Sequence, residues 1–121
     1  MIGSPILSDM NMIKPGVDLR GLSAVWGVAY PMIQKTFEEY GYACIVTSAN
    51  DGTHLPNSLH YKGKALDFRT KHMAVMDKAK VIEAIRAVLG AQFDLVFESV
   101  GLPNEHAHIE FDPKETSTEH V

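Results

Sequence analysis

The sequence predicts a small α+β domain, with a largely antiparallel sheet and flanking helices. Two observations support this fold class: helical and extended patterns alternate along the chain, and the expected strands are close neighbours in the sequence. The 121 residues suit one domain, with a core at about residues 18–113 and flexible ends. Hydrophobic residues make up 45% and charged residues 21% of the chain, a globular composition that excludes wholesale disorder or fibrous structure.

Two segments carry apolar residues at helical spacing. The first covers residues 18–40, where Pro31 marks either a kink or the start of a second helix, and Gly41 is a natural stop. The second covers residues 76–89 and ends at Gly90, because glycine readily adopts the backbone conformation that closes many helices. These are the helices expected to flank the sheet.

Short segments rich in β-branched and aromatic residues, bounded by turn residues, predict the strands. Strands are expected at residues 42–48, 93–98 and 106–111. Two further extended segments lie on either side of Gly63 within residues 59–69, and a two-residue loop at Gly63-Lys64 would join them as a hairpin.

Charge and hydropathy exclude several classes of function. The net charge of -4 argues against a nucleic-acid or anionic-lipid partner. The longest apolar runs are shorter than the ~20 residues that a membrane helix requires. Cys44 is the single cysteine and cannot form an internal disulfide. The first residues lack the pattern of a secretory signal, so we expect the protein to be synthesised in a cytoplasm. We also expect the protein to be a monomer.

The placement of the six histidines indicates a metal site. His106 and His108 are two apart in an expected strand, so they share one face of the sheet with Glu110. In the expected hairpin, His60 and Asp67 face each other with Cβ atoms ~5 Å apart. His60, Asp67 and one strand histidine would supply two nitrogens and one oxygen with an open fourth position, as in catalytic zinc sites, whereas structural zinc sites usually close with cysteines.

Each of these residues also has an ordinary structural interpretation. A single His-x-His is weak evidence for a metal, and His60 alone is more often a surface or hydrogen-bonded histidine. Asp67 could be a solvent-facing residue of an amphipathic strand. The combination of the two patterns favours the metal site. His72 and His120 have no such companions, and we expect them to face solvent.

Residues 58–67 carry a family resemblance. They match Ser-x-His-x-x-Gly-x-Ala-x-Asp at every fixed position, and a late His-x-His or Glu-x-x-His motif follows. This signature resembles the zinc peptidases of bacterial cell walls, which include D-Ala-D-Ala carboxypeptidases, D-Ala-D-Ala dipeptidases and phage endolysins; hedgehog signalling domains share their fold. The resemblance covers roughly residues 22–113, and the segment 51–54 looks most similar to small phage or prophage members. It implies a hedgehog/DD-peptidase-like fold.

The resemblance implies one zinc ion held by His60, Asp67 and His108. Glu105 lies three residues before His108, as does the general base of the family's Glu-x-x-His form. His106 matches the first histidine of the His-x-His form, which supports catalysis without binding the metal. We therefore expect Glu105 to be the base and His106 to stabilise the transition state.

Strand parity complicates this assignment of the base. It places His106 on the metal side and sends Glu105 the other way, unless a bulge or the turn at Asn104 re-aims the side chain. Glu98 and Glu110 are the reserve candidates for the base, although each is more often a solvated strand carboxylate.

Three residues are expected to bind substrate: Ser58, His54 and Arg69. Arg69 shares a strand face with Asp67, where it would orient that carboxylate or attract an acidic stem peptide. Family members that act on a free C-terminal carboxylate often carry Thr-Ser-Gly-x-Arg after the first strand. Residues 47–51 instead end in Asp51, whose charge would repel such a carboxylate. An endopeptidase is therefore favoured over a carboxypeptidase.

The expected function is that of a single-domain, zinc-dependent endolysin-like peptidase that hydrolyses a peptidoglycan stem-peptide bond by metal-activated water and a carboxylate base. It would act on the cell wall after release from the cell or as part of a phage particle, without nucleic-acid or membrane partners. The alternatives are a non-catalytic, metal-containing binding module on the same fold and a phage structural or accessory protein whose histidines are structural.

Overall fold

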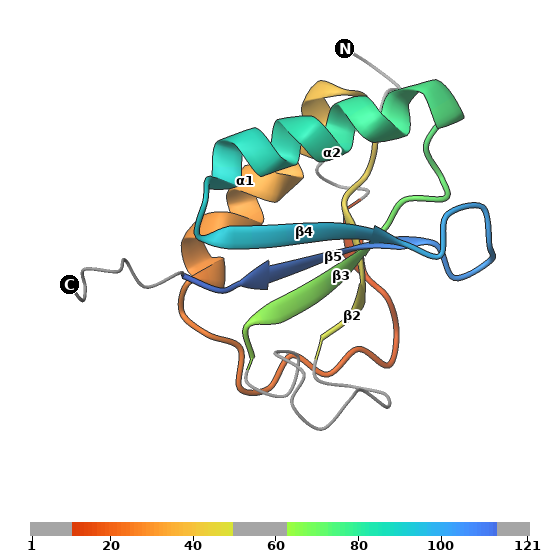
Figure 1. Ribbon diagram of the computed structural model, residues 1–121. Coiled ribbons are helices and arrows are strands. Elements are labelled where there is room, and N and C mark those ends of the chain that lie inside the picture. The colour runs from red at the N-terminus through yellow and green to blue at the C-terminus, as the bar shows by residue number, and fades with distance from the viewer. Residues whose placement is uncertain (1–10, 50–62, 114–121) are drawn as a thin grey trace, which may run out of the picture.

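The computed structural model describes residues 11–49 and 63–113. Two helices lie on one face of a five-stranded sheet, and the described residues leave much of the opposite face without a covering helix (Figure 1). The α+β class and the largely antiparallel sheet are thus confirmed. The helices are α1 (Trp26–Glu39) and α2 (Val75–Leu89). The strands are β1 (Met12–Ile13), β2 (Ile45–Ser48), β3 (Ala65–Arg69), β4 (Phe93–Glu98) and β5 (His106–Phe111).

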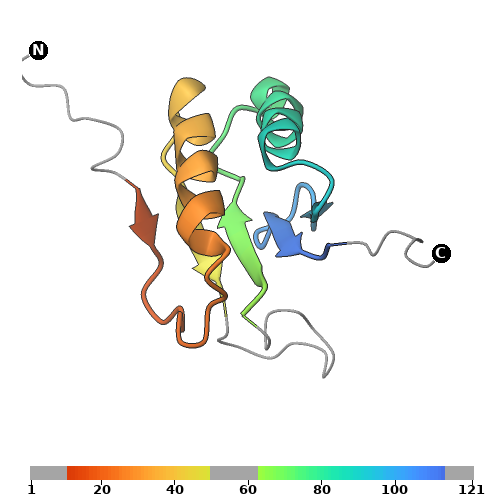
Figure 2. The same ribbon diagram turned by 90° about the vertical axis from the view of Figure 1, so that its left-hand side faces the viewer.

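The strand order is β1-β2-β3-β5-β4, so β3 and β5 lie side by side within the sheet. β1 pairs with β2 in parallel, and every other neighbouring pair is antiparallel. In Figure 2 the two helices run side by side, and β1 forms the edge remote from β4. This order brings together β3 and β5, which are separated in the chain by α2 and β4.

The hydrophobic core fills the space between the helices and the sheet. Successive strand residues point to opposite faces, so β3 directs Leu66 and Phe68 toward the helices. Ile109 on β5 packs in the same layer and is fully buried. The helices contribute Ile33, Phe37, Val81 and Ile85 to this core. The residues between these strand positions point to the opposite face, where the polar side chains gather.

The first helix is shorter than its apolar pattern predicts. It begins at Trp26 rather than at residue 18, and Pro31 lies inside it as one continuous element, so a second helix does not start there. Before the helix, Asp18 accepts a hydrogen bond from the backbone N–H of Arg20 at 3.0 Å, and Gly21 has a φ of +77°. These turn conformations compete with helix formation.

The remaining described elements agree with the sequence pattern except at the start of β2, which begins at Ile45 rather than at residue 42. The predicted strands 93–98 and 106–111 are β4 and β5 without change, and α2 begins one residue before the predicted 76–89. The expected hairpin partner of β3 falls largely within residues 50–62, outside the described part of the chain. β1 was not predicted, because it lies in a segment expected to be flexible.

Gly63 is fixed in place by the segment that precedes α1. Its carbonyl accepts hydrogen bonds from Ser23 N–H at 2.8 Å and from the indole Nε1–H of Trp26 at 3.1 Å. Its φ is +70°, and a Cβ atom would lie 1.9 Å from the carbonyl oxygen of Gly21. Only glycine fits this position without a shift of the backbone. The fixed glycine of the Ser-x-His-x-x-Gly pattern thus has a steric role here.

His72 is partly buried, so the expectation that it faces solvent is wrong. Its Nε2 lies 2.8 Å from the carbonyl oxygen of Ala43, and its ring stacks against Phe37 with centroids 6.2 Å apart. Burial lowers the pKa of its imidazole. His72 therefore packs against α1 and the segment that leads into β2, and it is not one of the candidate metal ligands.

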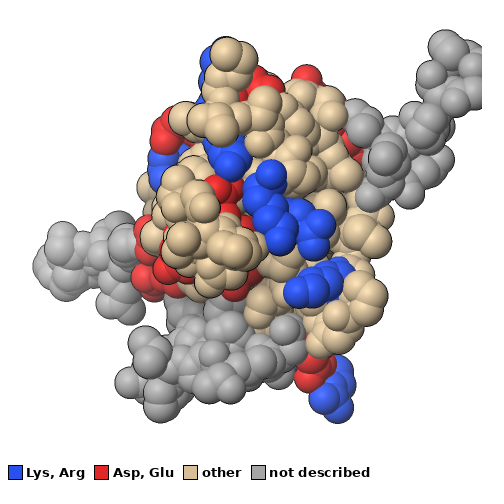
Figure 3. Space-filling model, turned by 90° about the vertical axis from the view of Figure 1, so that its right-hand side faces the viewer, with Lys and Arg blue, Asp and Glu red and all other residues tan. Residues whose placement is uncertain are grey.

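Charged side chains are unevenly distributed over the surface. The chain has 11 Lys and Arg residues against 15 Asp and Glu residues. Figure 3 views the molecule from the side where the β4–β5 loop projects, and it shows lysine and arginine side chains gathered near acidic ones. Within the described residues, neither helix has the length and apolar character that a membrane crossing requires.

Candidate functional site

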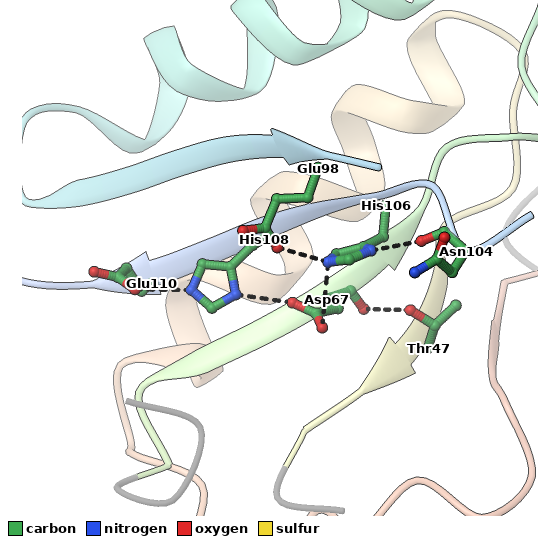
Figure 4. Close-up of polar contacts among 7 residues, drawn as sticks. All are labelled: Thr47, Asp67, Glu98, Asn104, His106, His108 and Glu110. Atoms are coloured by element: carbon green, nitrogen blue, oxygen red, sulfur yellow. Dashed lines mark hydrogen bonds and ion pairs between the residues drawn. The ribbon is translucent and has the colours of Figure 1, made fainter. Parts of the chain in front are cut away.

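The candidate site lies on the face of the sheet opposite the helices. The antiparallel register places Asp67 of β3 directly opposite His108 of β5, and Arg69 opposite His106. β4 adds Glu98, which pairs with His106 on the other side of β5. Because these residues alternate with core residues along each strand, their side chains project from one face. Figure 4 shows this arrangement for Asp67, Glu98, His106 and His108.

Asp67 and His108 form the centre of this face. His108 Nδ1 lies 2.9 Å from Asp67 Oδ1, and His108 Nε2 lies 2.7 Å from Glu110 Oε1 (Figure 4). Asp67 is only 8% exposed. The imidazole is therefore held between two carboxylates, one of which is buried in the sheet.

This environment changes the protonation of His108. Burial acts to lower its pKa, but hydrogen bonds to Asp67 and Glu110 and the negative charges of those carboxylates outweigh burial and raise the pKa to about 9. In the metal-free fold, the imidazolium thus neutralises part of the acidic charge on this face of the sheet.

The donor atoms of Asp67 and His108 suit a shared metal ion. Two ligands of a tetrahedral zinc ion at ~2.1 Å each lie about 3.4 Å apart. Asp67 Oδ1 and His108 Nδ1 are 2.9 Å apart, at hydrogen-bond distance, so a shared ion requires the two atoms to separate by about 0.5 Å. A metal-bound histidine usually donates its other ring N–H to a carboxylate or carbonyl group. Glu110 offers such an acceptor to His108 Nε2. His60, the third expected ligand, lies outside the described residues.

His106 lies beside this pair, and both of its ring nitrogens face acceptors. Nδ1 donates to the backbone carbonyl of Asn104 at 2.7 Å, and Nε2 lies 2.8 Å from Glu98 Oε1 (Figure 4). Nε2 is also 3.7 Å from Asp67 Oδ2. The imidazole is thus fixed in orientation and presents a polar N–H edge next to the candidate metal ligands.

The structure places Glu105 on the helix side of the sheet, away from Asp67 and His108. Its carboxylate accepts hydrogen bonds from Thr70 Oγ1 at 2.6 Å, from Gly101 N–H at 2.9 Å and from Lys78 Nζ at 2.9 Å. The residue is 4% exposed. Glu105 directly precedes β5, and its side chain points in the direction that strand parity predicts. This placement does not fit the expectation that Glu105 is the general base.

These contacts also set the charge of Glu105. Burial acts to raise its pKa, but the hydrogen bonds from Thr70, Gly101 and Lys78, with the positive charge of Lys78, outweigh burial and hold the pKa below its usual value. Glu105 is thus an ionised anchor between the β4–β5 loop and α2. Sequence reasoning missed Lys78 as its partner, because a contact between a helix and a loop 27 residues away leaves no local pattern.

A second group of acidic side chains lies farther along the same face. Among the described residues, Asp94, Glu110 and Asp112 have donor oxygens within 4.8 Å of one another, and this group could hold a metal ion. An all-oxygen donor set is typical of calcium, magnesium or manganese sites rather than zinc sites. The sequence pattern did not single out Asp94 or Asp112.

The expected substrate-binding residues divide between described and undescribed parts of the chain. Ser58 and His54 lie outside the described residues. Arg69 borders a hollow of about 210 Å³ that is also lined by His106, Lys14 and Lys71. Lys71 follows Asp67 and Arg69 at strand spacing, a signal that could have indicated it. Lys14 reaches the hollow through the pairing of β1 with β2, which the sequence pattern did not reveal.

Comparisons of the chain with protein-family models, with curated proteins and with solved structures gave no match.

Proposed function

We propose that the chain is a zinc-dependent peptidase that hydrolyses a bond in the stem peptide of bacterial peptidoglycan, as an endopeptidase rather than a carboxypeptidase. The observation that carries the proposal is the 2.9 Å contact between Asp67 and His108 Nδ1, together with the contact of His108 Nε2 with Glu110. These two residues occupy the expected ligand positions of the Ser-x-His-x-x-Gly-x-Ala-x-Asp and His-x-His patterns, which come from distant parts of the chain. We infer a hedgehog/DD-peptidase-like fold from the same combination.

In this proposal Asp67, His108 and His60 hold the zinc ion. Zinc, when bound, supplies Lewis acidity that acidifies a water molecule and polarises the scissile carbonyl. Glu110 fixes the orientation and tautomer of His108 through the contact at Nε2. Asp67 is buried and paired, so its carboxylate is held in one position within the sheet.

His106 and Glu98 are the proposed catalytic residues. Because Nδ1–H of His106 is bound to the carbonyl of Asn104, only the imidazolium form carries a proton on Nε2 as well. In that form Nε2–H, which adjoins Asp67 and Glu98, can turn to the negative charge that develops on the peptide oxygen. Glu98 is half exposed and 2.8 Å from His106, so it can accept a proton from water and return it to the leaving amine. Glu98 therefore takes the role of general base in place of Glu105.

The biological setting is proposed on the same basis. A stem-peptide hydrolase without a nucleic-acid or membrane partner would act as a monomer on the cell wall, either after release from the cell or as part of a phage particle. The absence of an arginine at residues 47–51 favours an internal bond of the stem peptide over a terminal D-Ala-D-Ala bond.

The test combines metal analysis with digestion of purified peptidoglycan. We expect about one zinc ion per chain and new muropeptide termini detected by mass spectrometry. Asp67→Asn should lose both zinc and activity. Asp18→Asn, in the turn before α1, is the matched control, and it should retain both. Zinc binding without hydrolysis would indicate a non-catalytic metal-binding module, and the absence of zinc binding would overturn the proposal.

A further inference from the structure

We propose that the hollow next to His106 is a subsite that binds a carboxylate group of the peptide substrate. The hollow has a volume of about 210 Å³, and three of the residues that line it are cationic: Lys14, Arg69 and Lys71. It lies beside a candidate metal ligand, because His106, which lines it, has its Nε2 3.7 Å from Asp67 Oδ2. The choice of a peptide as the ligand rests on the proposed peptidase function.

The guanidinium of Arg69 provides the strongest indication of a ligand. Its Nε is buried and has no hydrogen-bond partner among the described residues. A buried donor without a partner costs free energy, and nearly all such groups in folded proteins are satisfied. Arginine presents planar, paired N–H groups that match the two oxygens of a carboxylate. A carboxylate bound in the hollow would therefore satisfy Arg69.

The two lysines add positive charge and further donors at the rim. Lys71 Nζ donates one hydrogen bond to the carbonyl of Pro103 at 2.9 Å, and an ammonium group has three N–H donors in all. Lys14 is exposed and is placed here by the backbone bond from its N–H to Val46 O at 2.9 Å. Lys14 and Lys71 can thus both bind a ligand in the hollow without breaking a contact in the protein interior.

The acidic residue that lines the hollow is already engaged by other groups. Glu105 also lines the hollow, but its carboxylate is bound by Thr70, Lys78 and Gly101. In a chain with more acidic than basic residues, three cations gathered beside a candidate active site are unexpected. Figure 3 shows lysine and arginine side chains gathered on this side of the molecule.

A stem peptide offers carboxylates of two kinds. A γ-linked glutamate leaves its α-carboxylate free beside an internal bond, and the last residue carries a terminal carboxylate. Either would present the same planar anion to Arg69. The volume of the hollow is sufficient for one such residue, which indicates recognition of a single group next to the scissile bond and not of a longer segment.

The experiment measures peptide binding to the full chain by NMR titration. The ligand is L-Ala-γ-D-Glu-L-Lys-D-Ala in four forms: free acid, α-carboxamide at the glutamate, C-terminal amide, and both amides. We expect amidation of the recognised carboxylate to weaken binding by roughly 10-fold to 100-fold, because charge-assisted hydrogen bonds are lost. The single-amide form that weakens binding identifies which carboxylate is bound.

Protein variants show whether the effect belongs to the hollow. In Arg69→Gln the difference between the free-acid and amide peptides should disappear. Lys71→Gln should reduce this difference, whereas Lys80→Gln, which removes the same charge from an exposed position on α2, should not. Lys71→Gln keeps the test decisive if Arg69→Gln fails to fold. Equal binding of all four peptides, no detectable binding of the free acid, or equal effects of the two lysine variants would overturn the subsite.

The titration is repeated on the metal-free and the zinc-loaded chain, with cleavage monitored in the latter. Carboxylate-dependent binding without cleavage of the peptide or of peptidoglycan would leave the subsite in place and remove the peptidase proposal. Cleavage at equal rates for all four peptides would remove the subsite and leave the peptidase in place.

Discussion

Lys78 Nζ lies 2.9 Å from the carboxylate of Glu105, and this ion pair joins α2 to the end of the β4–β5 loop. The Glu105 side chain is 1% exposed and that of Lys78 is 14% exposed. Because both charges are removed from water, each depends on the other to compensate the cost of burial. The same carboxylate accepts the N–H of Gly101, so it also holds the loop that leads into His106.

Replacement of Glu105 is expected to affect stability rather than chemistry. Glu105→Gln leaves the ammonium of Lys78 without its partner, and we expect a loss of about 3 kcal/mol in the free energy of unfolding, measured by urea denaturation. The exposed carboxylate of Glu83 provides the control: Glu83→Gln should cost less than about 0.5 kcal/mol. Zinc content should not change. If Glu105→Gln kept the stability of the wild type but abolished hydrolysis, the base would be Glu105 after all.

The pH dependence of stability should report on His108 in the metal-free protein. Its pKa is raised to about 9 from the ordinary value of 6.5, so the fold favours the protonated form. The resulting stabilisation is fully present below about pH 6.5 and is lost as the pH rises through about 9. We expect the melting temperature of the metal-free chain to fall between pH 7 and 9, and to fall less in His108→Gln.

The affinity for zinc should depend on pH in the opposite direction to the stability of the metal-free protein. A bound zinc ion must displace the proton from His108, so zinc affinity should rise with pH, by at most about tenfold per unit, until about pH 9. Competition with a chelator at several pH values measures this slope. His72→Gln is the control, because burial lowers the pKa of His72 and keeps its ring neutral over this range. A zinc affinity independent of pH would exclude His108 as a ligand.

Gly63 allows a test of the steric role of the motif glycine. In Gly63→Ala the new Cβ would lie 1.9 Å from Gly21 O, and the residue would also have to keep a φ of +70°. We expect a loss of about 2–5 kcal/mol from strain and overpacking together. Gly41 has a φ of +85° with nothing within 4 Å of a Cβ, so Gly41→Ala should lose only the part due to φ, about 1 kcal/mol. Equal losses in urea denaturation would contradict the steric explanation.

Local sequence patterns predicted much of the sheet but not how its distant parts meet. The alternation of residues 93–98 and 106–111 gave both strands their correct bounds and put His106, His108 and Glu110 on one face, because side-chain direction follows strand parity. Parity also predicted the opposite direction of Glu105, although the motif favoured it as the base. The contact of Lys78 with Glu105 and the approach of Lys14 to Arg69 depend on tertiary packing, which local periodicity does not encode.

The roles proposed for His106, Glu98 and Glu110, on the face of the sheet opposite the helices, can be tested by replacing each of them with glutamine. His106→Gln and Glu98→Gln should each lower kcat by at least about 100-fold with zinc still bound, because one removes a donor to the developing oxyanion and the other removes the proton acceptor. Glu110→Gln should instead weaken zinc binding by about 10-fold to 100-fold, because Glu110 orients His108. The two effects are separated by measuring kcat at saturating zinc. A Glu98→Gln enzyme with unchanged kcat would show that another group takes the proton, while an unchanged His106→Gln enzyme would show that this histidine only holds Glu98 in place.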